Sequence, residues 1–135
     1  MIAVDTSALV AIAFAEPERA AFKAAIRNAD KALVSAVSVV EARMVVFRRR
    51  GPDALEALND ILDLPMFEVV PPDLAELSIA HQAFVTYGRG SHHPANLNFG
   101  DLFSYALAKA RGAPLLFKGD DFGQTDIAVA VRLES

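Results

Sequence analysis

The sequence predicts an α/β domain built around a mostly parallel sheet. Short apolar segments of strand length alternate with helix-length segments from one end of the chain to the other, an order that is typical of parallel sheets. Acidic residues follow several of the predicted strands or open the helices that come next. The 135 residues contain no internal repeat, low-complexity tract or linker, so we expect one domain spanning residues 1–135 with a substantial core.

Proline and glycine mark the element boundaries in the first half of the chain. Pro17 suits the first turn of a helix, and Gly51 with Pro52 is the usual punctuation at a helix end. We expect a strand over residues 2–5, helices over 7–15 and 18–28, a strand over 32–34, and helices over 38–50 and 53–62.

The second half continues the same alternation. Pro71 and Pro72 introduce one helix, and Gly112 ends another. We expect a strand over residues 66–70, a helix over 73–87, a loop over 88–99 that is rich in Gly, His and Asn, a helix over 101–111, and strands over 115–117 and 127–131.

The composition excludes several classes of protein. Hydrophobic residues make up 53% of the chain, which excludes global disorder, and the absence of cysteine excludes a disulfide framework, a thiol nucleophile and a cysteine-ligated metal. Charge-free apolar stretches such as residues 6–15 and 32–40 are shorter than the roughly 18 apolar residues of a membrane span. No basic segment precedes an apolar one near residue 1, so we expect a cytoplasmic protein with no membrane partner.

Four acidic positions coincide with strand ends or helix starts. Asp5 ends the first strand, Glu41 lies in the helix after the second, Asp101 opens a helix, and the pair Asp120–Asp121 follows the strand over 115–117. Ligand sites of open α/β sheets form at the carboxyl ends of the strands. Taken singly, the four positions also fit a helix N-cap, a capping box, the helix dipole and an ordinary turn, in that order.

Together, these acids indicate a metal site. The sequence neighbours of Glu41 are small or apolar, and a charge there is costly to desolvate unless it is paired or bound to a cation. Several carboxylates at one sheet edge would also repel one another without a counter-ion. A hard divalent cation on carboxylate oxygens lowers the pKa of bound water and offsets phosphate charge, which suits phosphodiester hydrolysis. The net charge of −4 permits an RNA partner, because the rest of the chain is close to neutral once these acids bind cations.

Four ordered motifs resemble one known family. They are MIAVDTSA at residues 1–8, Glu41 within its helix, NFGD followed by LFSYA at 98–106, and LLFKGDDF at 115–122. In this order and at this spacing they resemble PIN-domain ribonucleases of the VapC type, the toxins of type II toxin–antitoxin pairs. The resemblance covers essentially the whole chain. It implies a three-layer α/β/α fold with a parallel sheet, and an endoribonuclease that uses Mg²⁺ or Mn²⁺.

The resemblance assigns catalytic roles to the acids. Asp5, Glu41 and Asp101 match the three firmest acidic positions of the family. Asp5 and Asp101 are expected to be the principal metal ligands, and Glu41 and Asp120 to act as further ligands, through water or as the group that orients the attacking water. For the fourth catalytic position we prefer Asp120, which directly follows a glycine, with Asp121 as its competitor.

A few further residues are expected to assist the acids. Thr6 matches the hydroxyl residue that follows the first acid of the family, and Ser104, one turn beyond the third, should face the same pocket. Arg43 and Lys118 are candidates for RNA contact, although Lys118 equally suits a strand end. The run 48–50, all arginine, fits a cationic helix C-terminus that complements the helix dipole.

The resemblance also implies partners. These are an RNA substrate such as tRNA or ribosomal RNA, a VapB-like antitoxin and a second copy of the chain. No segment resembles a DNA-binding module, so we expect no direct DNA binding by this chain. His92 and His93 are adjacent in a Pro- and Asn-containing loop, where two side chains rarely chelate one ion, and are expected to be solvated.

Three other functions fit the sequence less well. A haloacid-dehalogenase-like phosphatase needs a second Asp two residues after the first, and the chain has Ser7 there. A response-regulator receiver needs an Asp at the end of its middle strand, whereas the strand over 66–70 leads into two prolines. A PIN domain without activity would only bind partners, and a cleavage assay with and without chelator separates it from a nuclease.

Overall fold

A parallel sheet forms the centre of the molecule. The structure is a computed structural model that describes residues 1–132, and in that part of the chain the sheet has four strands. Every pairing between strands is parallel, as predicted. In spatial order the strands are β3 (Phe67–Val70), β2 (Ala32–Ser35), β1 (Ile2–Val4) and β4 (Leu115–Leu116).

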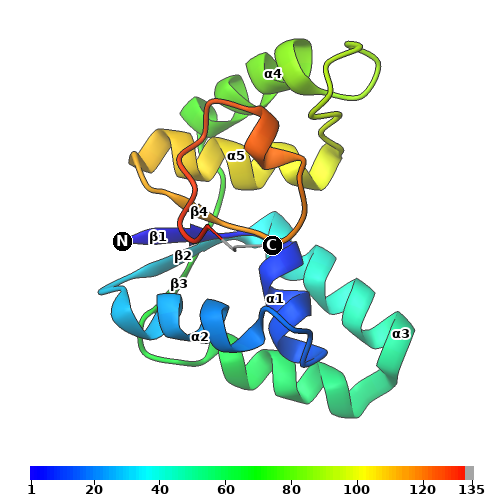
Figure 1. The fold of residues 1–135 in the computed structure, drawn as a ribbon, viewed down its shortest axis with the longest axis vertical. Helices are drawn as coiled ribbons and strands as arrows, with labels where there is room; N and C mark the ends of the chain where they lie inside the picture. The colour runs from blue at the N-terminus through cyan, green and yellow to red at the C-terminus, as the bar shows by residue number, and fades with distance from the viewer. Residues whose placement is uncertain (133–135) are drawn as a thin grey trace.

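Helices cover both faces of the sheet (Figure 1). Paired neighbours Ala3, Leu33 and Leu115 face the core under α4 and α5. The next residues along two of these strands, Val4 and Leu116, face the core under α1, α2 and α3, because successive strand side chains point to opposite faces. This arrangement confirms the three-layer α/β/α fold. The helices are α1 (Thr6–Ala13), α2 (Arg19–Asn28), α3 (Ala36–Leu62), α4 (Leu74–Tyr87) and α5 (Phe99–Arg111).

Helix α3 bends sharply at Gly51. The φ angle of Gly51 is 78°, in the left-handed region that favours glycine, and Pro52 follows it without a backbone N–H to donate. The predicted boundary between two helical segments is therefore confirmed at this position (Figure 1). The first segment, residues 36–50, begins at the carboxyl end of β2.

Two helices begin two residues earlier than predicted. Ser35 and Asn98 act as N-caps, since their side-chain oxygens accept hydrogen bonds from the backbone N–H groups of Val37 and Asp101. Each helix therefore begins directly after its cap, α3 at Ala36 and α5 at Phe99. Within residues 1–132, no helix combines the length and apolar character needed to cross a membrane.

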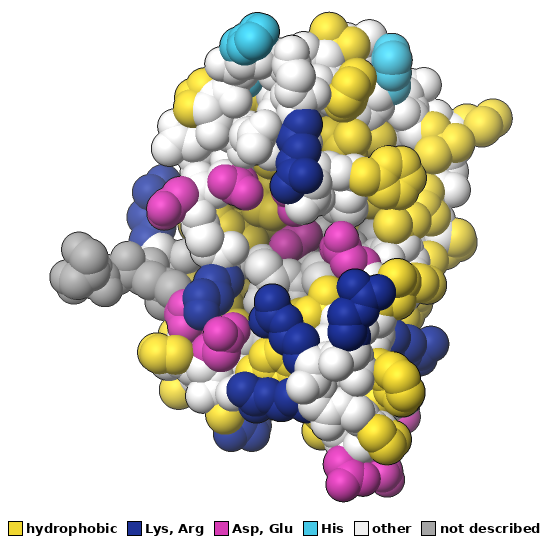
Figure 2. All heavy atoms as spheres, turned by 90° about the vertical axis from the view of Figure 1, so that its right-hand side faces the viewer, with side chains coloured by type: hydrophobic (Ala, Val, Ile, Leu, Met, Phe, Trp, Pro, Cys, Tyr) yellow, Lys and Arg dark blue, Asp and Glu magenta, His cyan; other side chains and the backbone are white. Residues whose placement is uncertain are grey.

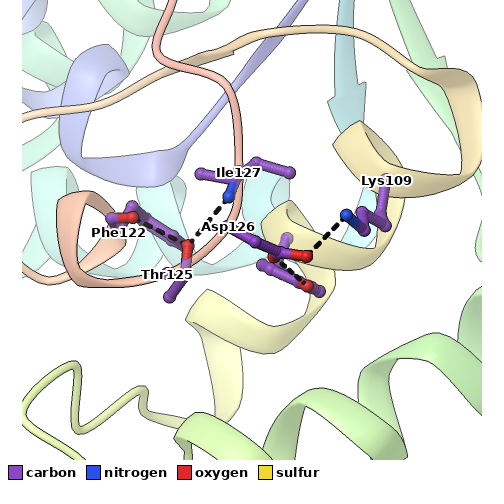
Figure 3. A network of polar contacts seen from close by, with 6 residues as sticks. Lys109, Phe122, Thr125, Asp126 and Ile127 are labelled. Atoms are coloured by element: carbon purple, nitrogen blue, oxygen red, sulfur yellow. Dashed lines mark hydrogen bonds and ion pairs between the residues drawn. The ribbon is translucent and has the colours of Figure 1, made fainter.

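The predicted strand over 127–131 is wrong. Val129 makes only a single parallel bridge to Leu115, because β4 is two residues long and offers no room for a longer ladder. Side chains hold the preceding segment instead (Figure 3). Lys109 of α5 forms an ion pair with Asp126, 2.7 Å from Nζ to Oδ2, and the Thr125 hydroxyl donates to the carbonyl of Phe122 at 2.7 Å.

Candidate active site

Three predicted acids meet at the carboxyl edge of the sheet. Asp5 directly follows β1, Glu41 lies early in α3, and Asp101 lies in the first turn of α5. All three line one cavity of about 350 Å³. On this side of the molecule, acidic side chains lie in a depression with Lys and Arg side chains around it (Figure 2). The topology thus brings together residues that are almost 100 positions apart in the chain.

Asp5 is a buried helix cap with one free oxygen. Its side chain is 3% exposed, and its Oδ2 accepts hydrogen bonds from the Ser7 backbone N–H at 3.0 Å and from the Ser7 hydroxyl at 2.7 Å. Its Oδ1 is buried without any hydrogen-bond partner in the described structure. A buried carboxylate oxygen without a partner is costly, so it marks a place where a cation would be stabilising.

Ser7 is a site residue that the sequence analysis missed. Its hydroxyl donates to Asp5 and accepts from the backbone N–H of Lys118 at 3.0 Å. It therefore links the carboxylate after β1 to the chain just beyond β4. The available signal was the spacing: two residues after an N-cap aspartate is the usual position of a capped N–H.

Asp101 combines a capping role with a perturbed pKa. Its Oδ2 accepts from the Asn98 N–H at 3.0 Å, and its own N–H donates to Asn98 Oδ1 at 2.9 Å, which completes a capping box. Burial, together with the nearby charges of Asp5, Glu41 and Asp121, raises the pKa of Asp101 to about 7. Negative charge is therefore crowded here.

Glu41 lies against the backbone of Gly100. A Cβ atom added to Gly100 would lie 2.6 Å from the carboxyl carbon of Glu41, far inside van der Waals contact. Only glycine leaves this space free. This explains the glycine of the NFGD motif, because a residue without a side chain allows the start of α5 to approach a carboxylate on α3.

The two candidates for the fourth acid lie in different surroundings. Asp121 is close enough to Asp101 to raise its pKa. Asp120 lines a separate cavity with Gln124 and Arg132. Both side chains are exposed. Neither of them lines the acidic cavity. The charge effect on Asp101 favours Asp121 over Asp120, the reverse of the preference drawn from the sequence.

The donor set fits a hard divalent cation. Carboxylate oxygens are the ligands that Mg²⁺ and Mn²⁺ prefer, and Asp5 contributes a buried oxygen without a partner. Among residues 1–132, no three acidic or histidine side chains lie close enough to form a ready-made cation cage. The carboxylates of Asp5, Glu41 and Asp101 would thus draw together around an ion, and that ion would relieve their repulsion.

The two predicted hydroxyl residues, Thr6 and Ser104, both contact Ser38 at the start of α3. The Thr6 hydroxyl donates to the carbonyl of Ser38 at 3.2 Å, although Thr6 also lines the cavity. Ser104 is fully buried, and its hydroxyl lies 3.1 Å from that of Ser38. Both residues therefore join α1 and α5 to the start of α3.

Of the predicted cations and the two loop histidines, only Lys118 lines the cavity. Arg43 does not line it, since its Nε donates to Asn59 Oδ1 at 3.1 Å. Lys118 does line it, and so does Arg49, which the sequence analysis assigned to the helix dipole. The histidines lie outside it. His92 is exposed, and His93 packs edge-on against Tyr87 with ring centroids 4.8 Å apart.

An apolar groove of about 700 Å³ adjoins the acidic cavity. Val40, Met44 and Phe99 contribute exposed apolar surface to it, with Phe99 73% exposed. Glu41 and Arg49 line both the groove and the cavity. A molecule in the groove would therefore touch the edge of the acidic site.

Sequence comparison places the chain among known proteins. The PIN domain family model matches residues 2–128. Ribonuclease VapC28 of Mycobacterium tuberculosis is 44% identical over 128 residues, which are 95% of this chain and 96% of that protein. Ribonuclease VapC42 of the same species is 43% identical over 127 residues, which are 94% of this chain and 97% of that protein.

Solved structures show the same fold. The crystal structure of M. tuberculosis VapC20, a toxin that cleaves the sarcin–ricin loop, is similar with a TM-score of 0.79 at 21% identity, over 98% of this chain and 100% of that one. VapBC2 from Rickettsia felis, bound to a promoter DNA fragment, is similar with a TM-score of 0.72 at 15% identity, over 96% of each chain. By sequence and by fold, the chain belongs to the VapC ribonucleases of the PIN-domain family.

Proposed function

We propose that this protein is a metal-dependent endoribonuclease that hydrolyses phosphodiester bonds in RNA as the toxin of a type II toxin–antitoxin pair. The observation that carries the proposal is the convergence of Asp5, Glu41 and Asp101 from three elements on one cavity. The buried Asp5 Oδ1 without a partner supports it. The relatives at 43–44% identity, which are named ribonucleases, support it further.

The four acids have different proposed roles. Asp5 and Asp101 would hold Mg²⁺ or Mn²⁺, and Glu41 and Asp121 would act as further ligands or orient the attacking water. The bound ion would supply a water of lowered pKa and a counter-charge for the phosphoryl oxygens. Ser7 holds Asp5 by Oδ2 and so leaves Oδ1 for the cation. Asp121 is preferred as the fourth acid because its charge reaches Asp101.

The partner protein is a VapB-like antitoxin that docks in the apolar groove beside the cavity. The support is the exposed apolar lining from Val40, Met44 and Phe99, which suits the apolar face of a helix. Because Glu41 and Arg49 belong to both spaces, an occupant would also obstruct the acids. We further propose that the protein acts in the cytoplasm and that it forms a homodimer. Light scattering of the purified protein would test the dimer.

The first experiment is a cleavage assay on total RNA. The purified protein, freed of inhibitor, is incubated with RNA in Mg²⁺, in Mn²⁺ and in chelator, and new 5′ ends are mapped. Asp5→Asn and Asp101→Asn proteins run in parallel. Discrete ends that need the metal and disappear in both variants are expected, and they would also identify the substrate. Folded wild-type protein that yields no metal-dependent ends would contradict the proposal.

A further inference from the structure

Four arginines lie on the first segment of α3, in different surroundings. Arg43 donates a hydrogen bond to Asn59 across the bend of the helix. Arg50 packs over the ring of Phe14, with 4.1 Å from its guanidinium carbon to the ring centroid. Arg48 lines only the apolar groove. Of these three arginines, none lines the acidic cavity, which leaves Arg49.

Arg49 is the arginine that faces the acids. It lies eight residues after Glu41 on α3, about two helical turns away, and both residues line the acidic cavity together with Val45. Its side chain lines the acidic cavity and is exposed. Among the residues that the structure describes, no carboxylate lies within 4.0 Å of its guanidinium group. Arg49 is therefore a cation beside the active site with no carboxylate partner in the described chain.

Lys118, the other cation of the cavity, is already paired. Its Nζ lies 3.2 Å from a carboxylate oxygen of Glu16 and 3.2 Å from one of Glu18. These glutamates belong to the turn after α1, in which Ala15 has a left-handed φ of 52°. The other oxygen of Glu18 is buried with no hydrogen-bond partner in the described structure. Removing Lys118 would thus leave two carboxylates beside a constrained turn without their counter-ion.

We propose that Arg49 binds a backbone phosphate of the RNA beside the acidic cavity, and that Lys118 ties the turn after α1 to the end of β4 without contacting RNA. A planar guanidinium group matches two phosphate oxygens at once, and Arg49 has no carboxylate to leave before it binds. Lys118 would have to give up two ion pairs. This assignment rests on the proposed function, since it concerns the substrate of the same site.

The test measures how RNA affinity depends on salt. A labelled oligouridylate is titrated by fluorescence anisotropy in Ca²⁺ buffer over a KCl series, and its integrity is checked on a gel afterwards. The proteins are wild type, Arg49→Ala, Arg49→Lys, Lys118→Met and Arg27→Ala. Arg27 is exposed near the end of α2 and provides a charge-matched control. Thermal melting of each protein reports folding.

The expected results separate the two cations. Arg49→Ala should bind roughly tenfold more weakly at low salt, and its slope of log affinity against log salt should decrease by about 0.7, the value for one phosphate of a single strand. Arg49→Lys should keep most of the slope, because it keeps the charge. Lys118→Met should melt at a lower temperature with an unchanged slope, and Arg27→Ala should match wild type.

Two results would overturn the assignment. One is a wild-type slope and affinity in Arg49→Ala, and the other is a loss of slope in Lys118→Met equal to that in Arg49→Ala. Wild-type protein that does not bind the oligouridylate even at low salt would also overturn it. Failure of the proposed function is a separate outcome, because it is read from the absence of metal-dependent cleavage by wild-type protein in the total RNA assay.

Discussion

The candidate metal-site acids are held in two different ways. Asp5 and Asp101 lie at helix starts, where their carboxylates accept hydrogen bonds from nearby backbone N–H groups. Asp120 and Asp121 lie in an exposed turn after Gly119, whose φ is 103°. The first pair is fixed by the same bonds that begin the helices, whereas the position of the second depends on one exposed turn. We therefore expect the helix-start acids to dominate metal binding and the turn acids to adjust it.

The largest effect should come from the helix-start acids. Asp5→Asn and Asp101→Asn each remove the charge of a proposed metal ligand but keep an oxygen that can accept the capping bond. Cleavage should decrease by at least about 100-fold, because even the loss of a group behind a metal ligand costs about 10–100-fold. Initial rates in Mg²⁺ measure this, and circular dichroism checks that the fold is kept. A variant with more than a tenth of wild-type activity would contradict the ligand assignment.

A second test uses the close approach of α5 to α3. In Gly100→Ala the new methyl group would displace the carboxylate of Glu41, which is the end of a flexible side chain. Cleavage should decrease roughly tenfold to 100-fold, because a misplaced catalytic group loses its alignment, while the melting temperature changes little. The control is a double-mutant cycle: in a Glu41→Ala background the same substitution should have no further effect. A full second loss in that background would contradict the mechanism.

The raised pKa of Asp101 gives a prediction about stability. The ordinary value is 3.8 and the folded value is about 7, so the folded state binds a proton that the unfolded state releases between these pH values. The contribution of Asp101 to the free energy of unfolding in chelator should thus be fully present below the lower value. It should be lost, by about 1–2 kcal/mol after allowance for solvent screening, as pH rises through the upper one. Urea denaturation at several pH values measures this, and Mg²⁺ should restore stability at neutral pH.

The control for the pH effect is Asp101→Asn, which cannot ionise. This variant should lack the part of the pH dependence that Asp101 contributes, and in chelator at neutral pH it should be more stable than wild type. Equal pH slopes in the two proteins would show that the Asp101 carboxylate is not destabilised in the folded state.

Ser7 tests whether hydrogen bonding orients Asp5. Ser7→Ala removes the hydroxyl that donates to Asp5 at 2.7 Å and accepts from the N–H of Lys118 at 3.0 Å. Stability should decrease by about 1 kcal/mol, the usual value for such hydrogen bonds, and more Mg²⁺ should be needed for half-maximal cleavage. Ser7→Thr, which keeps a hydroxyl, is the matched control. An unchanged Mg²⁺ requirement in Ser7→Ala would mean that the backbone N–H alone orients Asp5.

The two kinds of acid also differ in how well the sequence predicts them. Asp5 and Asp101 could be placed because strand ends and capping patterns are local, and the parallel order of the elements brings them together. Ser7 was missed because one of its partners, Lys118, lies 111 positions away. The choice between Asp120 and Asp121 depends on the backbone angles of a turn, which the residue types there do not determine.

The remaining error is the assignment of Arg49 to the helix dipole, and the positions of the three arginines around the helix axis explain it. Arg48, Arg49 and Arg50 are identical in type, and the helix dipole accounts for all three equally well. Their environments differ because each step along a helix rotates the side chain by about 100°. The spacing from Glu41 does not select Arg49, because Arg48 lies about 20° and Arg49 about 80° from Glu41 around the helix axis. Only the packing of α3 against its neighbours shows that Arg49 lines the acidic cavity.

The smallest expected effect concerns the turn acids, and it decides which of them belongs to the site. The charge of Asp121 raises the pKa of Asp101, and Asp120 lines another cavity. In metal-free protein, Asp121→Asn should therefore lower the pKa of Asp101 by a few tenths of a unit, as expected for a partly screened charge, and Asp120→Asn should leave it unchanged. Carboxyl NMR titration measures both, with the Asp101→Asn spectrum to assign the resonance.

Activity should follow the same order as the titration. Asp121→Asn should reduce cleavage at limiting Mg²⁺ severalfold and recover at high Mg²⁺, because a peripheral carboxylate contributes mainly by attracting the ion. Asp120→Asn is a matched control, since it removes the same charge one residue away in the same exposed turn. Equal losses in the two variants would mean that the turn acts only through its net charge. A larger loss in Asp120→Asn would mean that the turn rearranges when the metal binds and presents Asp120 to it.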